Sequence, residues 1–237
     1  MADYQELKQR TWEANLELPR QGLVLYTFGN VSTIDREQGV IAIKPSGVPY
    51  DRLQPGDIVI VDMDNKVVEG KLRPSSDTKT HLVLYKQFST IGGVVHTHAS
   101  YSTAWAQAMR AVTILGTTHA DHLTMDIPCT EPMNEAQIKG DYEVETGNQI
   151  IRLFREQNLD YRAVEMVLVA CHGPFTWGSS PEKAVYNSVI LEELAKMALL
   201  TYQVNPLVPR LSAALIDKHF QRKHGKHAYY GQQPDAD

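Results

Sequence analysis

The sequence predicts an α/β protein in which helices and strands belong to one domain. Runs with the two-residue period of strands and runs with the helical period are mixed along the whole chain. No linker, internal repeat or heptad pattern divides the 237 residues, and 15 glycines with 12 prolines exclude collagen-like and disordered classes. We therefore expect one domain over residues 1–232 and a disordered tail at 233–237.

The first half of the chain is predicted to be mostly strand. A segment rich in helix formers, residues 4–18, ends at Pro19. Three β-like runs follow, and Asp64-Asn65 turns the third into a hairpin. A serine-rich cap then opens an amphipathic helix that extends to Phe88. The predicted strands are residues 22–28, 39–44, 57–63 and 66–70.

In the second half, strands alternate with longer helices. The clearest helix begins at Ser180, where a capping pattern includes a proline in the first turn. The last helix stops at Gly225, and Gly173-Pro174 predicts a turn. The predicted strands are residues 92–98 and 166–170, and the other predicted helices are residues 102–109, 143–157 and 211–224.

Charge and cysteine content narrow the classes of partner and compartment. The formal net charge is −5 and the pI is about 6.0, which does not suit a nucleic-acid or membrane-surface binder. No apolar run reaches the roughly 18 residues of a membrane span, and the charged first ten residues do not resemble a signal peptide. Cys129 and Cys171 are expected to be free thiols in the cytoplasm, with a single bridge as the alternative.

Two strand ends carry histidines with metal-ligand spacing. His96 and His98 lie two residues apart, so a strand would point both imidazoles to one side. His172 ends a second predicted strand, on which Met166, Leu168 and Ala170 alternate with it. Three protein ligands are the number that a catalytic metal site uses while it keeps one position open. The alternative is that these are solvated polar residues at strand ends.

Several other polar residues have both a chemical and a structural interpretation. Asp77 fits a fourth metal ligand or general base, but also an ordinary N-cap. Asp121 fits an acid–base group or a solvated loop residue. Three turn segments offer the backbone N–H groups, hydroxyls and cation that bind phosphate, although each alone is common turn chemistry. These segments are residues 29–32, 44–47 and 74–77, and no nucleotide-binding glycine motif accompanies them.

Taken in order, nine short motifs resemble the class II aldolase/adducin-like superfamily, and within it the L-ribulose-5-phosphate 4-epimerases. They extend from near Glu13 to Gln232 and are specific as an ordered set. The resemblance implies a three-layer α/β/α sandwich with a central, largely antiparallel sheet, and a C4 homotetramer with active sites between subunits. The motifs are GNVS (29–32), KPSG (44–47), PSSDT (74–78), HTH (96–98), GTTHAD (116–121), IPCT (127–130), HGPF (172–175), KHF…RKHG (218–225) and AYYGQ (228–232).

The same resemblance implies roles for individual residues. It makes Asp121 and Tyr230 the acid–base pair, with His219 in support. One divalent metal ion per subunit, Zn²⁺ first and Mn²⁺ or Co²⁺ otherwise, would be bound by Asp77, His96, His98 and His172. The phosphate and the rest of the substrate would be bound by Gly29, Asn30, Lys44, Ser46, Gly47, Ser75, Ser76, Glu143 and Arg222.

The implied reaction interconverts L-ribulose 5-phosphate and D-xylulose 5-phosphate in L-arabinose or L-ascorbate catabolism. The C4 hydrogen is not acidic, so the C3–C4 bond is cleaved by a retro-aldol step, the aldehyde rotates and the bond re-forms. A divalent metal stabilises the enediolate that the cleavage leaves. His122-Leu123 departs from the aromatic pair expected after GTTHAD, so this loop is expected to pack differently.

Three alternatives remain at this stage. An aldolase for L-fuculose 1-phosphate or L-rhamnulose 1-phosphate is expected to carry Glu where this chain has Asp77. A metal-free adducin-type interaction domain would not need the three histidines. A hydrolytic metalloenzyme would be expected to show HxHxDH, whereas His98 is followed by Ala-Ser-Tyr.

Overall fold

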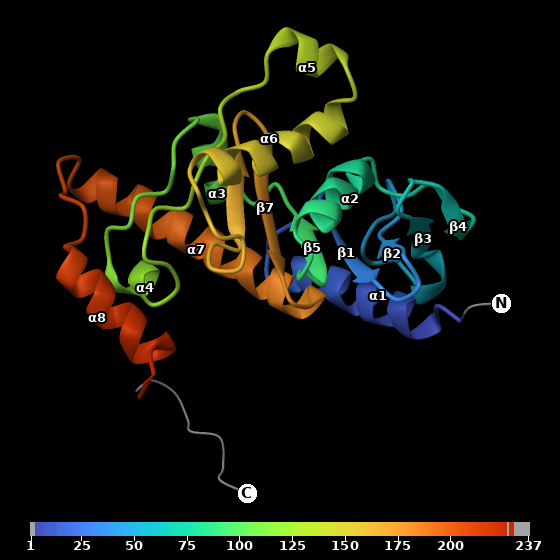
Figure 1. The fold of residues 1–237 in the computed structure, drawn as a ribbon, viewed down its shortest axis with the longest axis horizontal. Coiled ribbons are helices and arrows are strands. Elements are labelled where there is room, and N and C mark those ends of the chain that lie inside the picture. The colour runs from blue at the N-terminus through green and yellow to red at the C-terminus, as the bar shows by residue number, and fades with distance from the viewer. Residues whose placement is uncertain (1–2, 227, 230–237) are drawn as a thin grey trace, which may run out of the picture.

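Seven strands form one sheet in the order β4-β3-β2-β1-β5-β7-β6, and every neighbouring pair is antiparallel (Figure 1). The computed structural model describes residues 3–226 and 228–229. The antiparallel sheet that the resemblance implied is therefore confirmed. The strands are β1 (Asn30–Asp35), β2 (Val40–Ile43), β3 (Val59–Asp62), β4 (Val67–Glu69), β5 (Gly93–His96), β6 (Met166–Val169) and β7 (Gly173–Gly178).

Helices cover both faces of this sheet, which gives the three predicted layers (Figure 1). The alternation of β5 shows how: Val94 packs in a cluster with Leu82 of α2, while Val95 packs with Leu18 of α1 and Val185 of α7. Among the described residues, no helix is both long and apolar enough to cross a membrane. The helices are α1 (Gln5–Arg20), α2 (Thr78–Gln87), α3 (Ser100–Gln107), α4 (Thr117–Ala120), α5 (Glu135–Lys139), α6 (Tyr142–Glu156), α7 (Pro181–Val204) and α8 (Ala213–His224), with a 3-10 turn, η1 (Pro55–Asp57).

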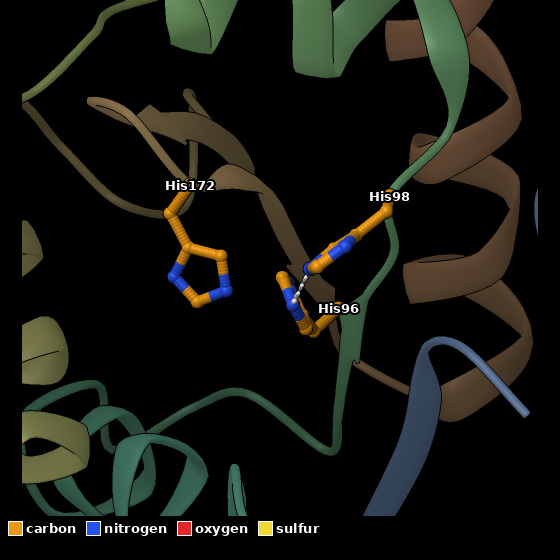
Figure 2. A group of neighbouring side chains, drawn as sticks. All are labelled: His96, His98 and His172. Atoms are coloured by element: carbon orange, nitrogen blue, oxygen red, sulfur yellow. Dashed lines mark hydrogen bonds between the residues drawn. The ribbon is translucent and has the colours of Figure 1, made fainter.

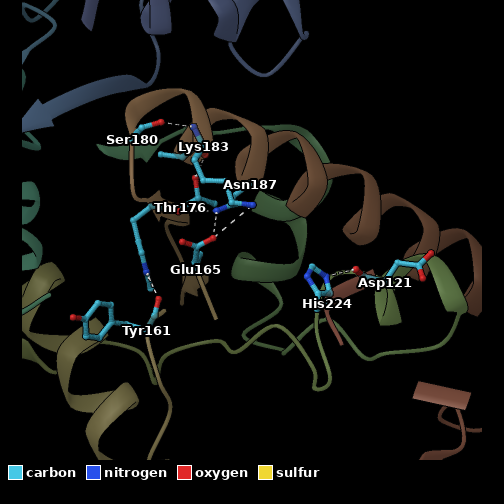
Figure 3. Close-up of polar contacts among 10 residues, drawn as sticks. Asp121, Tyr161, Glu165, Thr176, Ser180, Lys183, Asn187 and His224 are labelled. Atoms are coloured by element: carbon cyan, nitrogen blue, oxygen red, sulfur yellow. Dashed lines mark hydrogen bonds and ion pairs between the residues drawn. The ribbon is translucent and has the colours of Figure 1, made fainter. Parts of the chain in front are cut away.

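The start of α7 is capped and tied to the sheet. The Ser180 side chain accepts a hydrogen bond from the backbone N–H of Lys183 at 3.2 Å, as its capping pattern predicts (Figure 3). One turn later, the Asn187 amide donates to Glu165 Oε2 at 2.9 Å and to the Trp177 carbonyl at 2.7 Å. These bonds join α7 to β7 and fix the helix across the strands that carry the site.

One predicted strand is wrong. Residues 22–28 form turns and irregular backbone, and Leu25, Tyr26 and Phe28 are exposed there. Tyr26 has φ of 53°, which interrupts an extended chain. The strand lies instead at Asn30–Asp35, where β2 and β5 pair with it on both sides. Apolar content alone does not make a strand, because the ladder partners decide where the backbone pairs.

The turn at Gly173-Pro174 is also wrong. The chain reverses one step earlier, at residues 170–172, where Cys171 has φ of 61°. Gly173 and Pro174 begin β7, where a proline near the first residue forgoes only one ladder bond. His172 therefore lies in the β6–β7 turn and does not continue the alternation of β6.

Smaller shifts occur at other boundaries. Pro19 lies inside the last turn of α1, where its missing N–H removes only one backbone bond, and the helix ends at Arg20. β5 ends at His96, so His98 lies beyond the strand. The short helices α4 and α5 were not predicted. The predicted hairpin of β3 with β4 and the predicted helices α2, α6, α7 and α8 are confirmed.

The close approach of β5 to α7 makes Gly93 sensitive to any side chain. A Cβ at Gly93 would lie 2.3 Å from Pro181 Cα and 2.5 Å from Pro181 N. Gly93→Ala should therefore force α7 away from the sheet and lower the free energy of unfolding by about 1–3 kcal/mol. Urea unfolding measures this, with Gly56→Ala as the control because nothing lies within 4 Å of its Cβ. Equal stability of the two variants would contradict the packing described here.

Candidate active site

Three histidines from two parts of the chain meet at the end of β5. His96 is the last residue of β5, His98 follows two residues later, and His172 comes from the β6–β7 turn. One ligand atom from each lies within 4.8 Å of the others (Figure 2). The Nε2 atoms of His96 and His98 are 3.0 Å apart. The convergence that the HxH spacing and His172 predicted is thus present.

The surroundings of these imidazoles present free lone pairs to one point. His96 Nδ1 lies 2.9 Å from the Pro174 carbonyl oxygen, so it carries the proton and leaves Nε2 as the acceptor. The His96 ring stacks on Phe175 at 4.2 Å, its partner in the β5–β7 register. His172 Nδ1 is buried without a hydrogen-bond partner in the described structure. Three imidazoles thus bring ligand nitrogens within 4.8 Å of one another, and this donor set fits a divalent metal ion.

The electrostatics of the cluster keep it ready to bind a cation. Burial, and then the neighbouring His96, lower the pKa of His172 to about 4. Burial and His96 also lower the pKa of His98. Both imidazoles are therefore neutral at pH 7, which is the form that coordinates metals.

Asp77 lies at the first turn of α2 but does not cap it. Its backbone is at the N-cap position, yet its side chain makes no cap bond, so the capping interpretation is wrong for the carboxylate. Its Oδ2 instead accepts from Asn30 Nδ2 at 2.7 Å. Burial raises the pKa of Asp77, but His96, His81 and the Asn30 amide outweigh it and hold the pKa below its usual value. The carboxylate is thus ionised, and it faces the pocket that holds the three histidines.

The three predicted phosphate segments lie side by side. The Ser75 N–H donates to the Lys44 carbonyl at 3.0 Å, and the Ser46 N–H donates to the Arg73 carbonyl at 2.9 Å. Asn30 Nδ2 also contacts Ser75 Oγ at 3.1 Å. We call these three segments, residues 29–32, 44–47 and 74–77, the anion-binding wall. A cavity of about 390 Å³ joins the anion-binding wall to the three histidines. The predicted site residues that line it are Gly29, Asn30, Lys44, Ser46, Gly47, Ser75, Ser76, Asp77, His96, His98, Glu143 and His172.

Three residues that line the pocket were not predicted to do so: Thr27, Phe28 and Tyr142. Pro45, which also lines it, lies within the predicted phosphate segment 44–47. The Phe28 ring lies 6.0 Å from the His98 ring, and the Tyr142 ring lies 6.2 Å from the His172 ring. Phe28 had been placed in a strand, where an aromatic residue signals only packing. Tyr142 is the first residue of α6 and lies next to the predicted Glu143, but it belongs to none of the nine motifs.

Asp121, one of the predicted acid–base pair, forms a separate cluster with residues of α8. Asp121, which follows α4, accepts from His219 Nδ1 at 3.0 Å and from Arg222 Nη2 at 2.8 Å, both on α8. His224 Nε2 lies 2.9 Å from the Asp121 carbonyl (Figure 3). Burial alone would raise the pKa of Asp121. Hydrogen bonds from Arg222 and His219 lower this pKa by more, so its net value is below the usual one. None of these residues lines the histidine pocket of the same chain, and Tyr230 and the tail at 233–237 lie outside the described residues.

The fold and the three-histidine pocket are those of metal-dependent class II aldolases. The chain belongs to the Class II Aldolase and Adducin N-terminal domain family, whose profile matches residues 9–199. It is 51% identical over 228 residues to L-ribulose-5-phosphate 4-epimerase UlaF of Salmonella paratyphi B (strain ATCC BAA-1250 / SPB7), covering 96% of this chain and 99% of that one. The resemblance stated from the motifs is confirmed, and the hydrolytic alternative is wrong.

Solved structures show the same fold at lower identity. An L-fuculose 1-phosphate aldolase matches with a TM-score of 0.77 and 24% identity, covering 94% of this chain and 97% of that one. An L-fuculose-1-phosphate aldolase from Thermus Thermophilus matches with a TM-score of 0.66 and 22% identity, over 87% and 100% of the two chains. YgbL of Escherichia coli, a putative aldolase/epimerase/decarboxylase, gives 0.69 and 23%, over 91% and 98%.

A fully buried histidine beneath the pocket predicts a pH-dependent stability. His81 Nδ1 lies 2.7 Å from Ser32 Oγ, and burial lowers its pKa to about 3. Because this native pKa is below the usual 6.5 of the unfolded chain, the unfolded state binds the proton first. The stability is complete above pH 6.5 and falls below it, by about 1.4 kcal/mol per pH unit for this histidine.

Urea unfolding of metal-free protein at about pH 7, 6 and 5 measures this slope. In His81→Gln the dependence should be shallower, since glutamine does not titrate. An unchanged slope in that variant would show that His81 is not protonated on unfolding.

Proposed function

We propose that this chain is an L-ribulose-5-phosphate 4-epimerase, which interconverts L-ribulose 5-phosphate and D-xylulose 5-phosphate. The observation that carries the proposal is the pocket, which joins three metal-ready histidines to an anion-binding wall. The 51% identity to an epimerase over 96% of the chain supports this activity over others of the family. The pathway it serves is L-arabinose or L-ascorbate catabolism.

The anion-binding wall explains how one fragment is retained during the reaction. Cleavage of C3–C4 leaves the enediolate of dihydroxyacetone and glycolaldehyde phosphate, and the aldehyde must rotate before the bond re-forms. A phosphate bound by Lys44, Ser46 and Ser75 keeps the aldehyde in the pocket while its carbonyl turns. The site thereby inverts C4 and does not release two products.

The metal would be bound by His96, His98, His172 and Asp77. Zn²⁺ suits the imidazole-rich set best, with Mn²⁺ or Co²⁺ as alternatives. When bound, such an ion supplies Lewis-acid stabilisation of the negative charge that cleavage creates. The neutral histidines and the ionised Asp77 would hold the ion at this end of the pocket.

Asp121 and Tyr230 would move the proton of the C4 hydroxyl, supported by His219, while Arg222 and Glu143 contact the substrate. Asp121 lies outside the histidine pocket of its own chain, which supports a C4 homotetramer whose sites combine two neighbouring subunits. Two free cysteines, Cys129 and Cys171, agree with the cytoplasmic location that we propose.

The activity is tested with a coupled assay. Purified protein is given L-ribulose 5-phosphate, and D-xylulose 5-phosphate is followed before chelation, after chelation and after metal is returned. We expect epimerisation that chelation removes and metal restores. Release of an aldehyde from a ketose 1-phosphate, with no epimerisation, would instead show an aldolase.

Two variants separate metal binding from proton transfer in this assay. His98→Ala should lose bound metal and activity together while its circular dichroism spectrum is unchanged, because His98 is exposed and lies beyond the end of β5. Tyr230→Phe should lower turnover with metal retained. Full activity in metal-free His98→Ala would contradict the mechanism.

Shared sites predict recovery when two inactive variants are mixed. His98→Ala damages only the metal half and Asp121→Asn only the acid–base half. Refolding a 1:1 mixture should restore about a quarter of the wild-type activity per site, because each half comes intact from one parent half of the time. Mixed protein that stays as inactive as its parents would show that each site lies within one subunit.

A further inference from the structure

Lys44 carries a buried positive charge that no carboxylate neutralises. Its side chain is only 1% exposed, at the end of β2. None of the ion pairs among the described residues includes it. Its nearest polar partner is the Pro45 carbonyl oxygen, 3.4 Å from Nζ. Burying an ammonium without a counter-ion costs free energy, so another contact is needed to keep the Lys44 ammonium in place when no anion is bound.

The aromatic ring of Tyr50 supplies the contact that Lys44 otherwise lacks. The Lys44 Nζ lies 4.8 Å from the ring centroid, within the range of a cation–π interaction. Tyr50 itself is 7% exposed, in the loop that follows β2. Because the ring is held by burial, it fixes the ammonium at the wall where Ser46 and Ser75 lie.

The hydroxyl of the same residue holds a second part of the pocket. It lies 2.9 Å from the carbonyl oxygens of both Phe28 and Gly29, to which its single proton can donate a shared hydrogen bond. Burial raises the pKa of Tyr50, so the hydroxyl remains a donor. Both carbonyls belong to the irregular segment that leads into β1.

This segment has little freedom to move, and it positions Asn30. Gly29 has φ of 74°, and a Cβ there would lie 2.8 Å from the His96 carbonyl oxygen and 2.8 Å from Val24. The next residue, Asn30, contacts Ser75 Oγ at 3.1 Å and Asp77 at 2.7 Å. The Tyr50 hydroxyl therefore anchors a turn that forms part of the anion-binding wall.

We propose that Tyr50 is a positioning residue for phosphate: its ring holds Lys44 and its hydroxyl holds the Phe28–Gly29 turn, so that the anion-binding wall is assembled before substrate binds. This inference rests on the proposed function, because it takes the phosphate of the sugar as the anion. Tyr50 touches no reacting atom, so its contribution should appear in binding and not in the chemical step.

The test uses the metal-loaded enzyme and inorganic phosphate as the probe. Tyr50→Phe keeps the ring and deletes the hydroxyl, whereas Tyr50→Leu deletes both. Tyr202→Phe is the matched control. The Tyr202 hydroxyl donates to Thr113 Oγ1 over 3.2 Å, and neither residue lines the pocket. Lys44→Met shows whether the phosphate measured is the one at this wall. Calorimetry gives the phosphate affinity, steady-state kinetics give KM and kcat, and metal content and melting temperature are recorded for each variant.

Tyr50→Phe should weaken phosphate binding and raise KM about 3–10-fold, with kcat and metal content unchanged. Tyr50→Leu should weaken phosphate binding about 30-fold or more, because the cation–π contact is also lost. Tyr202→Phe should bind phosphate as the wild type does. A lower melting temperature with wild-type phosphate affinity and KM in Tyr50→Phe would make the residue merely structural and overturn the inference. A wild-type enzyme that neither epimerises nor binds phosphate would instead overturn the proposed function, and this inference with it.

Discussion

The register of β5 against its two neighbours determines the whole site. Antiparallel pairing sets Asn30 of β1 and Phe175 of β7 directly opposite His96, so all three side chains emerge on the α2 face. Phe175 then orients the imidazole, and Asn30 reaches Asp77 at the start of α2. A slip of one residue would turn His96 to the α1 and α7 face, where Val95 now packs.

Two groups of polar side chains in the pocket favour ligands of opposite charge. At one end, three imidazoles converge at the end of β5, and burial lowers the pKa of His172 to about 4. At the other end, burial lowers the pKa of Lys44 to about 8, which leaves most of the ammonium charged at pH 7 but without a partner. Such groups destabilise an empty site and favour a cation and an anion at fixed positions. This arrangement suits a substrate with a metal-binding hydroxyketone at one end and a phosphate at the other.

The position of Asp121 adds a constraint of a different kind. Its carboxylate is held by His219 and Arg222 of α8, and α4 and α8 lie together at one end of the molecule, away from β5 and α2 (Figure 1). A residue fixed so firmly by its own chain does not reach the histidine pocket by a side-chain movement. If it acts there, a neighbouring subunit must bring it, and assembly would then be a condition for catalysis.

Local patterns in the sequence were enough for most elements and for the chemistry. Helix caps such as Ser180, the Asp64-Asn65 hairpin and the HxH pair depend on neighbouring residues, so they can be read along the chain. The ordered motifs added the family. The strand at residues 22–28 was misplaced, and Phe28, Tyr142 and Tyr50 were not recognised, because their roles come from partners far away in sequence. Pairing between strands, the turn of Asp77 away from its cap, and the place of His172 in the β6–β7 turn arise from long-range contacts, and these only the tertiary structure decided.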